Sequence, residues 1–456
     1  MSYQDSVAQL YALGHELAHT TSDMFDLAHM RSLLDPLGNP QCRFHSVLIA
    51  GTNGKGSTVS TLAAILIAAG HRTGLYTSPH LTRINERLRV NGEEIPDPDF
   101  AAVHQQVEAA IAPLLASGRL PWHPSFFEVL TAMAFLHFAR SGVEIAVLEV
   151  GMGGRLDATN VVEPLISVIA DISLDHQKFL GNTVRQIAAE KAGIIRPGGV
   201  VVTLPQHPEA NHVLGNTVLD RGARMVSAVP YVPPDVVVAR ASDPPEPGAA
   251  AGNRQPATGN CYPLTVMGER IQVQSPLVGR HQLRNVALAI ASAVELDRAG
   301  IRVSPADIER GIPRTHWPGR FQVIPGDPEF VLDAAHNPAG AWALRSVLSE
   351  RYQGRPLLFV FGAMRDKAIA EISEILFPLA ERVIATHADN PRSATAGQVQ
   401  QLASRSGAEV LTSPTVADAI RQARRWAAPR AVIVITGSTY VVGEAMRVLR
   451  HSPAVP

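Results

Sequence analysis

A glycine-rich turn near the N-terminus carries the strongest chemical signal in the chain. The run Gly51-Thr-Asn-Gly-Lys-Gly-Ser57 follows a β-branched apolar segment, residues 46–50, and precedes an Ala-, Ile- and Leu-rich segment, residues 59–69. A strand, a glycine turn and a helix in this order point backbone N–H groups at an anion bound to the helix N-terminus. Lys55 adds a charge for the β- and γ-phosphates, and Ser57 or Thr58 adds a hydroxyl for Mg²⁺. The pattern predicts a nucleoside-triphosphate site formed by Gly51, Thr52, Asn53, Gly54, Lys55, Gly56, Ser57 and Thr58.

The spacing within this turn differs from that of the usual phosphate loop. Ile49 stands five residues before Gly54, where the usual pattern has glycine, and Gly56 separates Lys55 from the hydroxyl residues. The alternative is a structural turn that needs glycine only for its positive φ. The nucleotide interpretation is favoured because the strand, the lysine and the hydroxyls all stand where phosphate binding requires them.

Ionisable residues follow further apolar segments. Glu149 stands near the end of the segment 145–150 and precedes a glycine turn, where a nucleotide-bound Mg²⁺ needs an oxygen ligand. His176 and Lys191 follow later strand-like segments. A lone carboxylate, histidine or lysine is structural more often than not. Together, in a phosphate-binding domain, the three suggest a metal centre.

The stretch from residue 76 to residue 90 is polar and cationic. Taken alone, it is typical of a solvent-exposed surface, although Ser78 stands where a second hydroxyl could reach a metal near the phosphates.

In the C-terminal part, Asp333 and His336 follow a short apolar segment, residues 330–333. A helix cap at Asp333 and a turn at Asn337-Pro338 are the structural alternatives. Opposite a phosphate-loop domain, these residues suggest the second half of an interdomain cleft.

Apolar runs that are typical of buried parallel strands alternate with helix-patterned stretches. This alternation predicts right-handed βαβ crossovers, doubly wound parallel sheets and ligands at the carboxyl ends of the strands. The expected strands are residues 46–50, 145–150, 166–170, 199–204, 356–361, 382–386 and 431–436, and the expected helices include residues 126–139, 285–299 and 339–352.

With 456 residues, the chain is long for a single hydrophobic core, so two domains are expected. The stretch 312–320, with two prolines and a glycine, is the expected linker. It divides the chain into an N-terminal domain, residues 1–312, and a smaller C-terminal domain, residues 313–456. Residues 243–260 are rich in Pro, Gly and Ala and predict a surface loop.

Composition excludes several classes of function. The net charge of −1 offers no basic stripe for nucleic acid. No apolar run reaches the length that spans a membrane, and the N-terminus lacks the pattern of a signal peptide. Cys42 and Cys261 stand far apart and in no metal-binding spacing, which suits a reducing compartment. We expect a cytoplasmic enzyme without a nucleic-acid or membrane partner.

Taken together, these motifs resemble the folylpolyglutamate synthase/dihydrofolate synthase family, the folate branch of the ATP-dependent Mur ligases. The resemblance runs from about residue 25 to the C-terminus, and its most specific parts are Thr77-Ser-Pro-His80 and Leu148-Glu-Val-Gly-Met-Gly-Gly-Arg-Leu-Asp-Ala-Thr-Asn160. The other matching motifs are Gly51 to Ser57, Asp175-His176, Glu190-Lys191, Trp317-Pro-Gly-Arg320 and Asp333-Ala-Ala-His-Asn-Pro338.

The resemblance implies the fold and the reaction. The fold is a phosphate-loop-type, doubly wound, mostly parallel α/β domain followed by a smaller Rossmann-like α/β domain. ATP phosphorylates a carboxylate of dihydropteroate or of a reduced folate, the amine of L-glutamate attacks the acyl phosphate, and phosphate leaves. Such a reaction asks the protein chiefly for positioning and for charge neutralisation. The implied partners are these small molecules, with the chain acting as a monomer.

The resemblance also assigns roles to residues. Lys55 contacts the phosphates, and Asn285, Arg320 and Asp333 contact ATP. Ser57, Ser78, Glu149, His176 and Lys191 serve Mg²⁺, with Lys191 carbamylated so that it presents oxygen to the metal. Asp333 and His336 lie beside the nucleotide and glutamate sites, and the implied catalytic residues are Lys55, His176, Lys191, Asp333 and His336. Residues 25–31 occupy the place of the pterin-contacting loop in a variant form.

There are two alternative interpretations. A Mur-type ligase for a cell-wall precursor usually has an extra N-terminal domain, whereas only about 45 residues precede the first expected strand. A non-catalytic nucleotide-binding regulator has no need of a metal centre built from Lys55, Glu149, His176 and Lys191. The presence of both motif sets favours the bifunctional folate enzyme.

Overall fold

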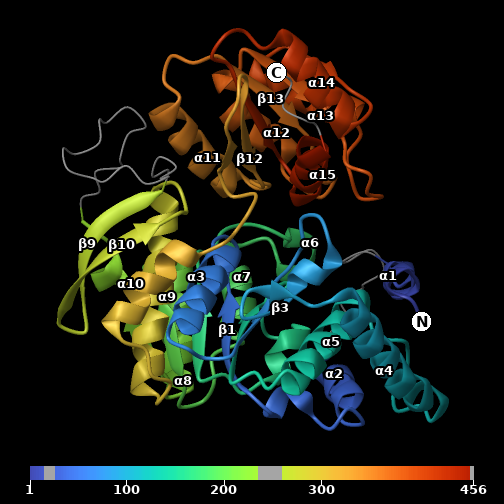
Figure 1. Cartoon of the computed structure of the whole chain (residues 1–456), viewed down its shortest axis with the longest axis vertical. Coiled ribbons are helices and arrows are strands. Elements are labelled where there is room, and N and C mark those ends of the chain that lie inside the picture. The colour runs from blue at the N-terminus through green and yellow to red at the C-terminus, as the bar shows by residue number, and fades with distance from the viewer. Residues whose placement is uncertain (15–25, 235–258, 452–456) are drawn as a thin grey trace.

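The chain folds around two large β-sheets, one above the other in Figure 1. The computed structural model describes residues 1–14, 26–234 and 259–451. Phe25 and nearly all of the expected surface loop, residues 243–258, lie outside the described residues.

The N-terminal sheet has eight strands in the order β4-β3-β2-β5-β1-β6-β7-β8. All neighbours from β2 to β8 pair in parallel, and β3 and β4 extend one edge in antiparallel fashion. The strands are β1 (His45–Ala50), β2 (Thr73–Tyr76), β3 (Leu88–Val90), β4 (Glu93–Glu94), β5 (Ile145–Glu149), β6 (Ile166–Ile169), β7 (Val200–Thr203) and β8 (Arg224–Ser227).

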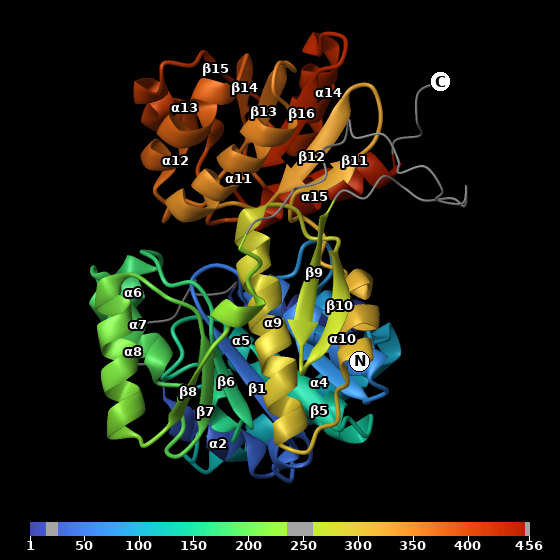
Figure 2. The same cartoon turned by 90° about the vertical axis from the view of Figure 1, so that its left-hand side faces the viewer.

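Helices cover both faces of this sheet, because successive side chains of its central strands point to opposite sides. In β1, Leu48 and Ala50 pack into one core, while Val47 and Ile49 pack into the other. The first face is covered by α1 (Tyr3–Ala12), α2 (Leu27–Leu34), α4 (Asp97–Ala116), α5 (Phe126–Arg140), α6 (Gln177–Leu180), α7 (Val184–Ala192) and α8 (Pro208–Asp220). The second is covered by α3 (Lys55–Ala68), α9 (Arg280–Arg298), α10 (Pro305–Gly311) and the hairpin of β9 (Asn260–Val266) and β10 (Glu269–Ser275), which Figure 2 shows beside α9.

The C-terminal sheet has six strands in the order β11-β12-β16-β13-β14-β15, and only β11 runs antiparallel. Its strands are β11 (Gln322–Ile324), β12 (Glu329–Asp333), β13 (Leu357–Phe361), β14 (Arg382–Ala385), β15 (Val410–Thr412) and β16 (Val432–Thr436). One face is covered by α11 (Pro338–Arg351), α12 (Ile369–Leu376) and α13 (Ala396–Leu402), and the other by α14 (Val416–Trp426) and α15 (Thr439–His451).

Short 3₁₀ turns complete the described structure: η2 (Pro40–Cys42), η3 (Ile84–Arg87), η4 (Ala158–Val161), η5 (Val229–Tyr231), η6 (Ile312–Arg314), η7 (Phe377–Leu379) and η8 (Ala403–Ser406). Within the described ranges, no helix combines the length and the apolar character that crossing a membrane would require.

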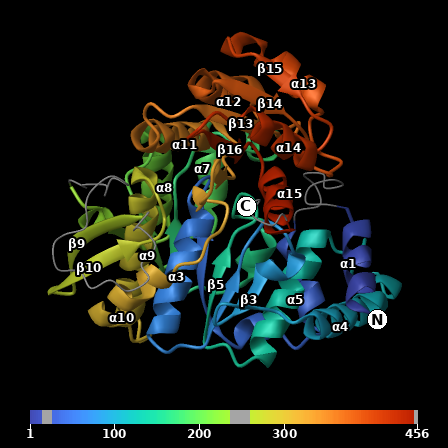
Figure 3. The same ribbon diagram turned by 45° about the horizontal axis from the view of Figure 1, so that its top comes forward.

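The two halves touch closely at glycines. Helix α15, which Figure 3 shows turned towards the N-terminal half, packs against the backbone of Leu81, since a Cβ built on Gly443 would lie 1.9 Å from the Leu81 carbonyl oxygen. The linker packs on the start of α3, where a Cβ on Gly56 would lie 2.3 Å from the ring of Trp317. Both contacts need a residue without a side chain.

The predicted doubly wound α/β fold is confirmed. All seven expected strands are present within one residue at each end, and the expected helix 285–299 begins five residues earlier, at Arg280. The strands that sequence reasoning missed include β2, β8, β15 and the β9–β10 hairpin. The expectation of a solvent-exposed surface at residues 76–90 is wrong for Arg87 and Arg89, which are buried.

Candidate active site

A cavity of about 500 Å³ lies between the two sheets. It is lined by residues that follow the carboxyl ends of β1, β5 and β6 in one half and of β12, β13 and β16 in the other, as expected for ligand sites of parallel sheets. The predicted site residues on its walls are Gly51, Thr52, Asn53, Gly54, Lys55, Gly56, Ser57, Ser78, Glu149, His176, Lys191, Asn285, Arg320, Asp333 and His336.

The glycine turn has the geometry of a phosphate-binding loop. Gly54 has a φ of +84° and ends the turn, so that α3 begins at Lys55. The Lys55 ammonium donates hydrogen bonds to the carbonyls of Gly51 at 3.1 Å and Thr52 at 3.4 Å, which holds its charge over the turn. The Thr58 hydroxyl donates to the Gly54 carbonyl at 2.9 Å and does not line the cavity, whereas Ser57 does.

Neighbouring elements fix the shape of this loop. The backbone N–H groups of Thr52 and Asn53 donate to the Asp171 carbonyl at 2.7 and 3.2 Å. Asn285 of α9 packs on the turn so tightly that a Cβ on Gly54 would lie 2.2 Å from its Oδ1 atom. The loop is therefore preorganised by the segment after β6 and by α9.

Glu149 and Ser78 meet beside the loop. The Ser78 backbone N–H donates to Glu149 Oε2 at 3.2 Å, and Glu149 is 4% exposed. Burial raises the pKa of Glu149 to about 7, although the charge of Lys55 opposes the shift. A cation at this position would favour the ionised carboxylate.

Burial shifts the protonation of Lys191 and His176, which both line the site, towards the neutral state. Lys191 is 3% exposed and donates to the Gly51 carbonyl at 2.8 Å. Burial and the nearby charge of Lys55 lower the pKa of Lys191 to about 7. Burial, with the charge of Lys367, lowers the pKa of His176 to about 3, so its imidazole is neutral near pH 7 and able to ligate a metal.

The C-terminal wall is organised around the end of β12. Asp333 accepts the backbone N–H groups of Phe321 at 2.8 Å and Ala335 at 2.9 Å, and burial raises its pKa. The helix cap belongs instead to Asn337, whose Oδ1 accepts the Gly340 N–H at 2.8 Å. This leaves Asp333 facing the cavity with Arg320 and His336.

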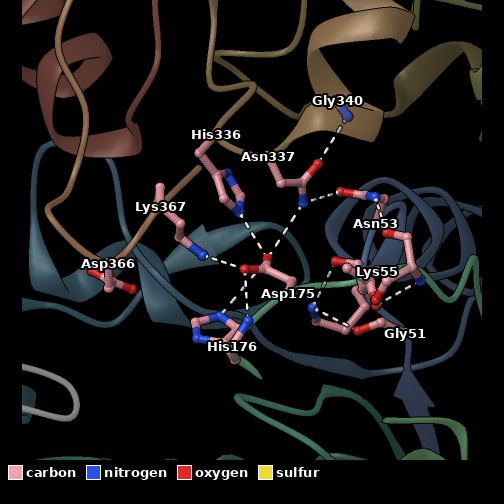
Figure 4. Close-up of polar contacts among 12 residues, drawn as sticks. Gly51, Asn53, Lys55, Asp175, His176, His336, Asn337, Gly340, Asp366 and Lys367 are labelled. Atoms are coloured by element: carbon pink, nitrogen blue, oxygen red, sulfur yellow. Dashed lines mark hydrogen bonds and ion pairs between the residues drawn. The ribbon is translucent and has the colours of Figure 1, made fainter. Parts of the chain in front are cut away.

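Two residues of the site were missed by sequence reasoning. The sequence motifs include Asp175 but assign it no role, and they do not include Lys367. Figure 4 shows them facing each other, with Asp175 Oδ1 and Lys367 Nζ 2.6 Å apart. Burial would raise the pKa of Asp175, but the approach of His336 and the charge of Lys367 outweigh it and hold that pKa well below its usual range. The available signal for Lys367 was its position after the apolar strand 356–361.

The segment expected to contact a pterin lies on another part of the same cavity. Asp26 and Met30, at the start and within α2, line the cavity with Phe126 and Phe127. His29 supports this wall from behind through a 2.8 Å contact of its Nδ1 atom with Glu128. An apolar and aromatic surface therefore adjoins the charged phosphate loop.

In the part of the chain that the structure describes, no three His, Cys, Asp or Glu side chains gather closely enough to hold a metal by themselves. The predicted metal set also draws on hydroxyl and lysine side chains.

Comparison with known proteins places this site in a class. Residues 49–218 match the Mur ligase middle domain, and residues 319–439 match the Mur ligase glutamate ligase domain. The two-walled cleft is thus that of a Mur-type ligase. Within this class, the chain belongs to the folylpolyglutamate synthase/dihydrofolate synthase family.

The relatives resemble the chain over nearly its whole length. It is 32% identical to the Bacillus subtilis dihydrofolate synthase/folylpolyglutamate synthase over 93% of this chain and 95% of that protein. The Mycobacterium tuberculosis folylpolyglutamate synthase complexed with ADP and AMPPCP superposes with a TM-score of 0.84 at 32% identity, covering 98% of this chain and 100% of the other. Escherichia coli FolC in complex with DHPP and ADP gives 0.80 at 28% identity, covering 99% of both chains.

Proposed function

We propose that the chain is an ATP-dependent ligase that adds L-glutamate to dihydropteroate, to the glutamyl tail of a reduced folate, or to both. The observation that carries the proposal is the single cavity that joins a phosphate loop, an aromatic wall and the C-terminal wall. The family relationship supports the same activity, and the nucleotide and DHPP in relatives' structures support the substrates.

The reaction needs these three surfaces together. The loop amides and Lys55 hold the phosphates of ATP while a substrate carboxylate attacks the γ-phosphorus and ADP leaves. The amine of L-glutamate then attacks the acyl carbon, loses a proton, and displaces phosphate to form the amide. The C-terminal wall covers the loop and limits the access of water to the acyl phosphate.

Arg320, Asp333 and Asn285 are proposed to contact ATP, and His336 and Asp333 to border the glutamate site. Their support is that all four line the cavity beside the phosphate loop. Arg320 also stands in the linker, directly before the C-terminal wall. It therefore adds a positive charge to the cavity beside the phosphate loop.

Mg²⁺ is proposed to be held by Ser57, Ser78, Glu149, His176 and Lys191, and it would neutralise phosphate charge when bound. The donor set fits if Lys191 is carbamylated. A pKa of about 7 leaves Lys191 partly as the neutral amine that can add CO₂. Carbamylation would replace a buried positive charge near Lys55 with an oxygen donor.

A domain boundary between residues 312 and 313 is part of the proposal. Its support is that α10, which ends at Gly311, packs on α3 of the first domain, whereas β11, which begins at Gln322, belongs to the second sheet. We also propose a monomer, since both walls of the cleft come from one chain, and a cytoplasmic location, which suits the unpaired, exposed Cys42 and Cys261.

The proposed function is tested by ADP release from the purified protein with ATP, Mg²⁺ and L-glutamate. Dihydropteroate is added to one sample and tetrahydrofolate to another. Turnover with both would establish the bifunctional enzyme, and turnover with one would assign a single activity. Turnover with neither, in a folded protein that binds ATP, would overturn the folate assignment and favour another Mur-type ligase.

A further inference from the structure

One buried carboxylate joins the two halves of the molecule. Asp175 belongs to the N-terminal half, where it follows β6, and its side chain is 8% exposed. Lys367 reaches it from the loop after β13, and its side chain is 7% exposed. His336 Nε2, from the loop after β12, lies 3.6 Å from the other carboxylate oxygen. The Asp175–Lys367 ion pair and the Asp175–His336 contact both cross between the halves.

The same cluster reaches the phosphate loop through Asn337. Its Nδ2 atom donates to Asn53 Oδ1 at 2.9 Å and to Asp175 Oδ2 at 3.3 Å (Figure 4). Its Oδ1 atom caps α11 by accepting the Gly340 N–H. One amide therefore connects the start of α11, the phosphate loop and Asp175.

The Asp175–Lys367 ion pair is important because both side chains are buried. An ammonium group removed from water is costly unless an opposite charge meets it. When the halves separate, both groups regain water. When the halves meet, Lys367 loses water and is compensated by Asp175. Asp175 thus supplies the opposite charge that Lys367 needs when the halves meet.

We propose that Asp175 is a positioning residue that seats the C-terminal domain on the phosphate loop and so places His336 and Lys367 over the cleft. The proposal rests on the proposed function for its turnover readout. Its structural readout, the closeness of the two domains, is independent of which substrate the protein ligates.

The first test compares Asp175→Asn with Asp171→Asn in the full chain bound to ADP. Asp171 also lines the cavity and also makes an ion pair, but with Arg284 of its own domain, at 2.8 Å. Small-angle X-ray scattering is expected to show a larger radius of gyration for Asp175→Asn than for the wild type, and no change for Asp171→Asn. Equal radii for all three proteins would overturn the proposal.

The second test measures turnover with whichever acceptor the wild type uses. Asp175→Asn is expected to lower kcat by about tenfold or more, because displaced catalytic groups cost rate steeply. Affinity for ADP should change by less than kcat, because the phosphate loop stays intact and only the contacts of Arg320 and Asp333 move with the C-terminal half. Asp175→Glu, which keeps the charge, should recover part of the rate. A loss of ADP affinity with unchanged kcat would contradict a positioning role.

Lys367→Met is the independent variant if Asp175→Asn does not fold. It should enlarge the radius of gyration as Asp175→Asn does, and the double variant should be no more open than the more open single variant, because the pair acts as a unit. Full additivity of the two changes would overturn the pairing. If the domains separate in these variants but the wild type ligates no folate, the proposed function fails and the seating role stands.

Discussion

The two walls of the cleft hold their polar groups by different means. On the N-terminal wall, Lys55 and Lys191 both donate to the carbonyl of Gly51, within one domain. On the C-terminal wall, His336 and Lys367 reach the cleft from separate loops, and both contact Asp175 of the other domain. The first wall is complete in one domain, whereas the second depends on how the domains meet.

This difference between the walls suggests that nucleotide binding and turnover depend on different parts of the molecule. We expect a wall fixed by its own loop and helix to bind phosphates even with the domains apart. A wall fixed across the interface is in place only when the domains are seated, which suits chemistry that must exclude water. Substitutions in the first wall should therefore affect phosphate handling directly, and those in the second should act through domain position.

The largest effect is expected from Lys55→Met. It removes the positive charge held over the phosphate turn while keeping an apolar side chain of similar length. We expect turnover to fall by at least about 10²–10³-fold, the cost of losing one group that stabilises developing charge. ADP release measures the effect, and unchanged scattering would show that the domains remain seated. Turnover within a few-fold of the wild type would contradict the role of Lys55.

Lys191→Ala should come next. It removes the group proposed to carry the carbamate, so ligation should fall by about 10²-fold or more, while ADP binding survives in part. Parallel measurements of ligation and of ADP affinity separate the two effects. Ligation at the wild-type rate would show that the carbamate has no role.

Gly56→Ala tests the contact between the linker and the start of α3. The added Cβ would lie 2.3 Å from the Trp317 ring. Overpacking of this kind costs about 1–3 kcal/mol, so the thermal midpoint should fall. Adding Trp317→Phe to this variant should restore part of the lost thermal stability, because the smaller ring leaves room for the new methyl group. An unchanged midpoint in Gly56→Ala would show that the linker does not rest on the phosphate helix.

The smallest effect is expected from Glu108→Gln, because Glu108 is not among the described residues that line the cavity. A hydrogen bond to Glu108, 3.2 Å away, raises the pKa of His123 above 6.5 against the opposing effect of burial. A raised pKa means that this stabilisation is present below pH 6.5 and is lost as the pH rises through the folded-state pKa.

The stability deficit of Glu108→Gln relative to the wild type should therefore be larger at about pH 6 than at about pH 9, and of about 1 kcal/mol or less because the pair is partly exposed. Thermal unfolding at the two pH values measures it. A deficit that grows with pH would contradict the sign. Domain seating should not change.

The sequence predicted the N-terminal wall well because its determinants are local. The strand, the glycine turn and the helix that hold Lys55 are consecutive, and β1 and α3 lie where the apolar pattern placed them. Glu149 was found by the same logic, as an acid at a strand end. The metal-binding roles and the carbamate on Lys191 remain predictions.

The C-terminal wall was predicted less completely because its determinants are distant in the chain. Nothing near Lys367 indicates that Asp175, 192 residues away, will meet it.

Arg87 of the N-terminal half was expected at a solvent-exposed surface because its stretch is polar, yet it is buried and donates to His80 at 2.9 Å. In each case tertiary packing decides the environment of a charge.

The most direct test of the central claim is the fate of the substrate carboxylate oxygen. The acceptor that turns over is prepared with heavy oxygen in its carboxylate and incubated with the protein, ATP, Mg²⁺ and L-glutamate, and the released phosphate is analysed by mass spectrometry. If ATP activates the carboxylate as an acyl phosphate in this cleft, each phosphate released by ligation carries one heavy oxygen. Unlabelled phosphate alongside amide product would contradict the account.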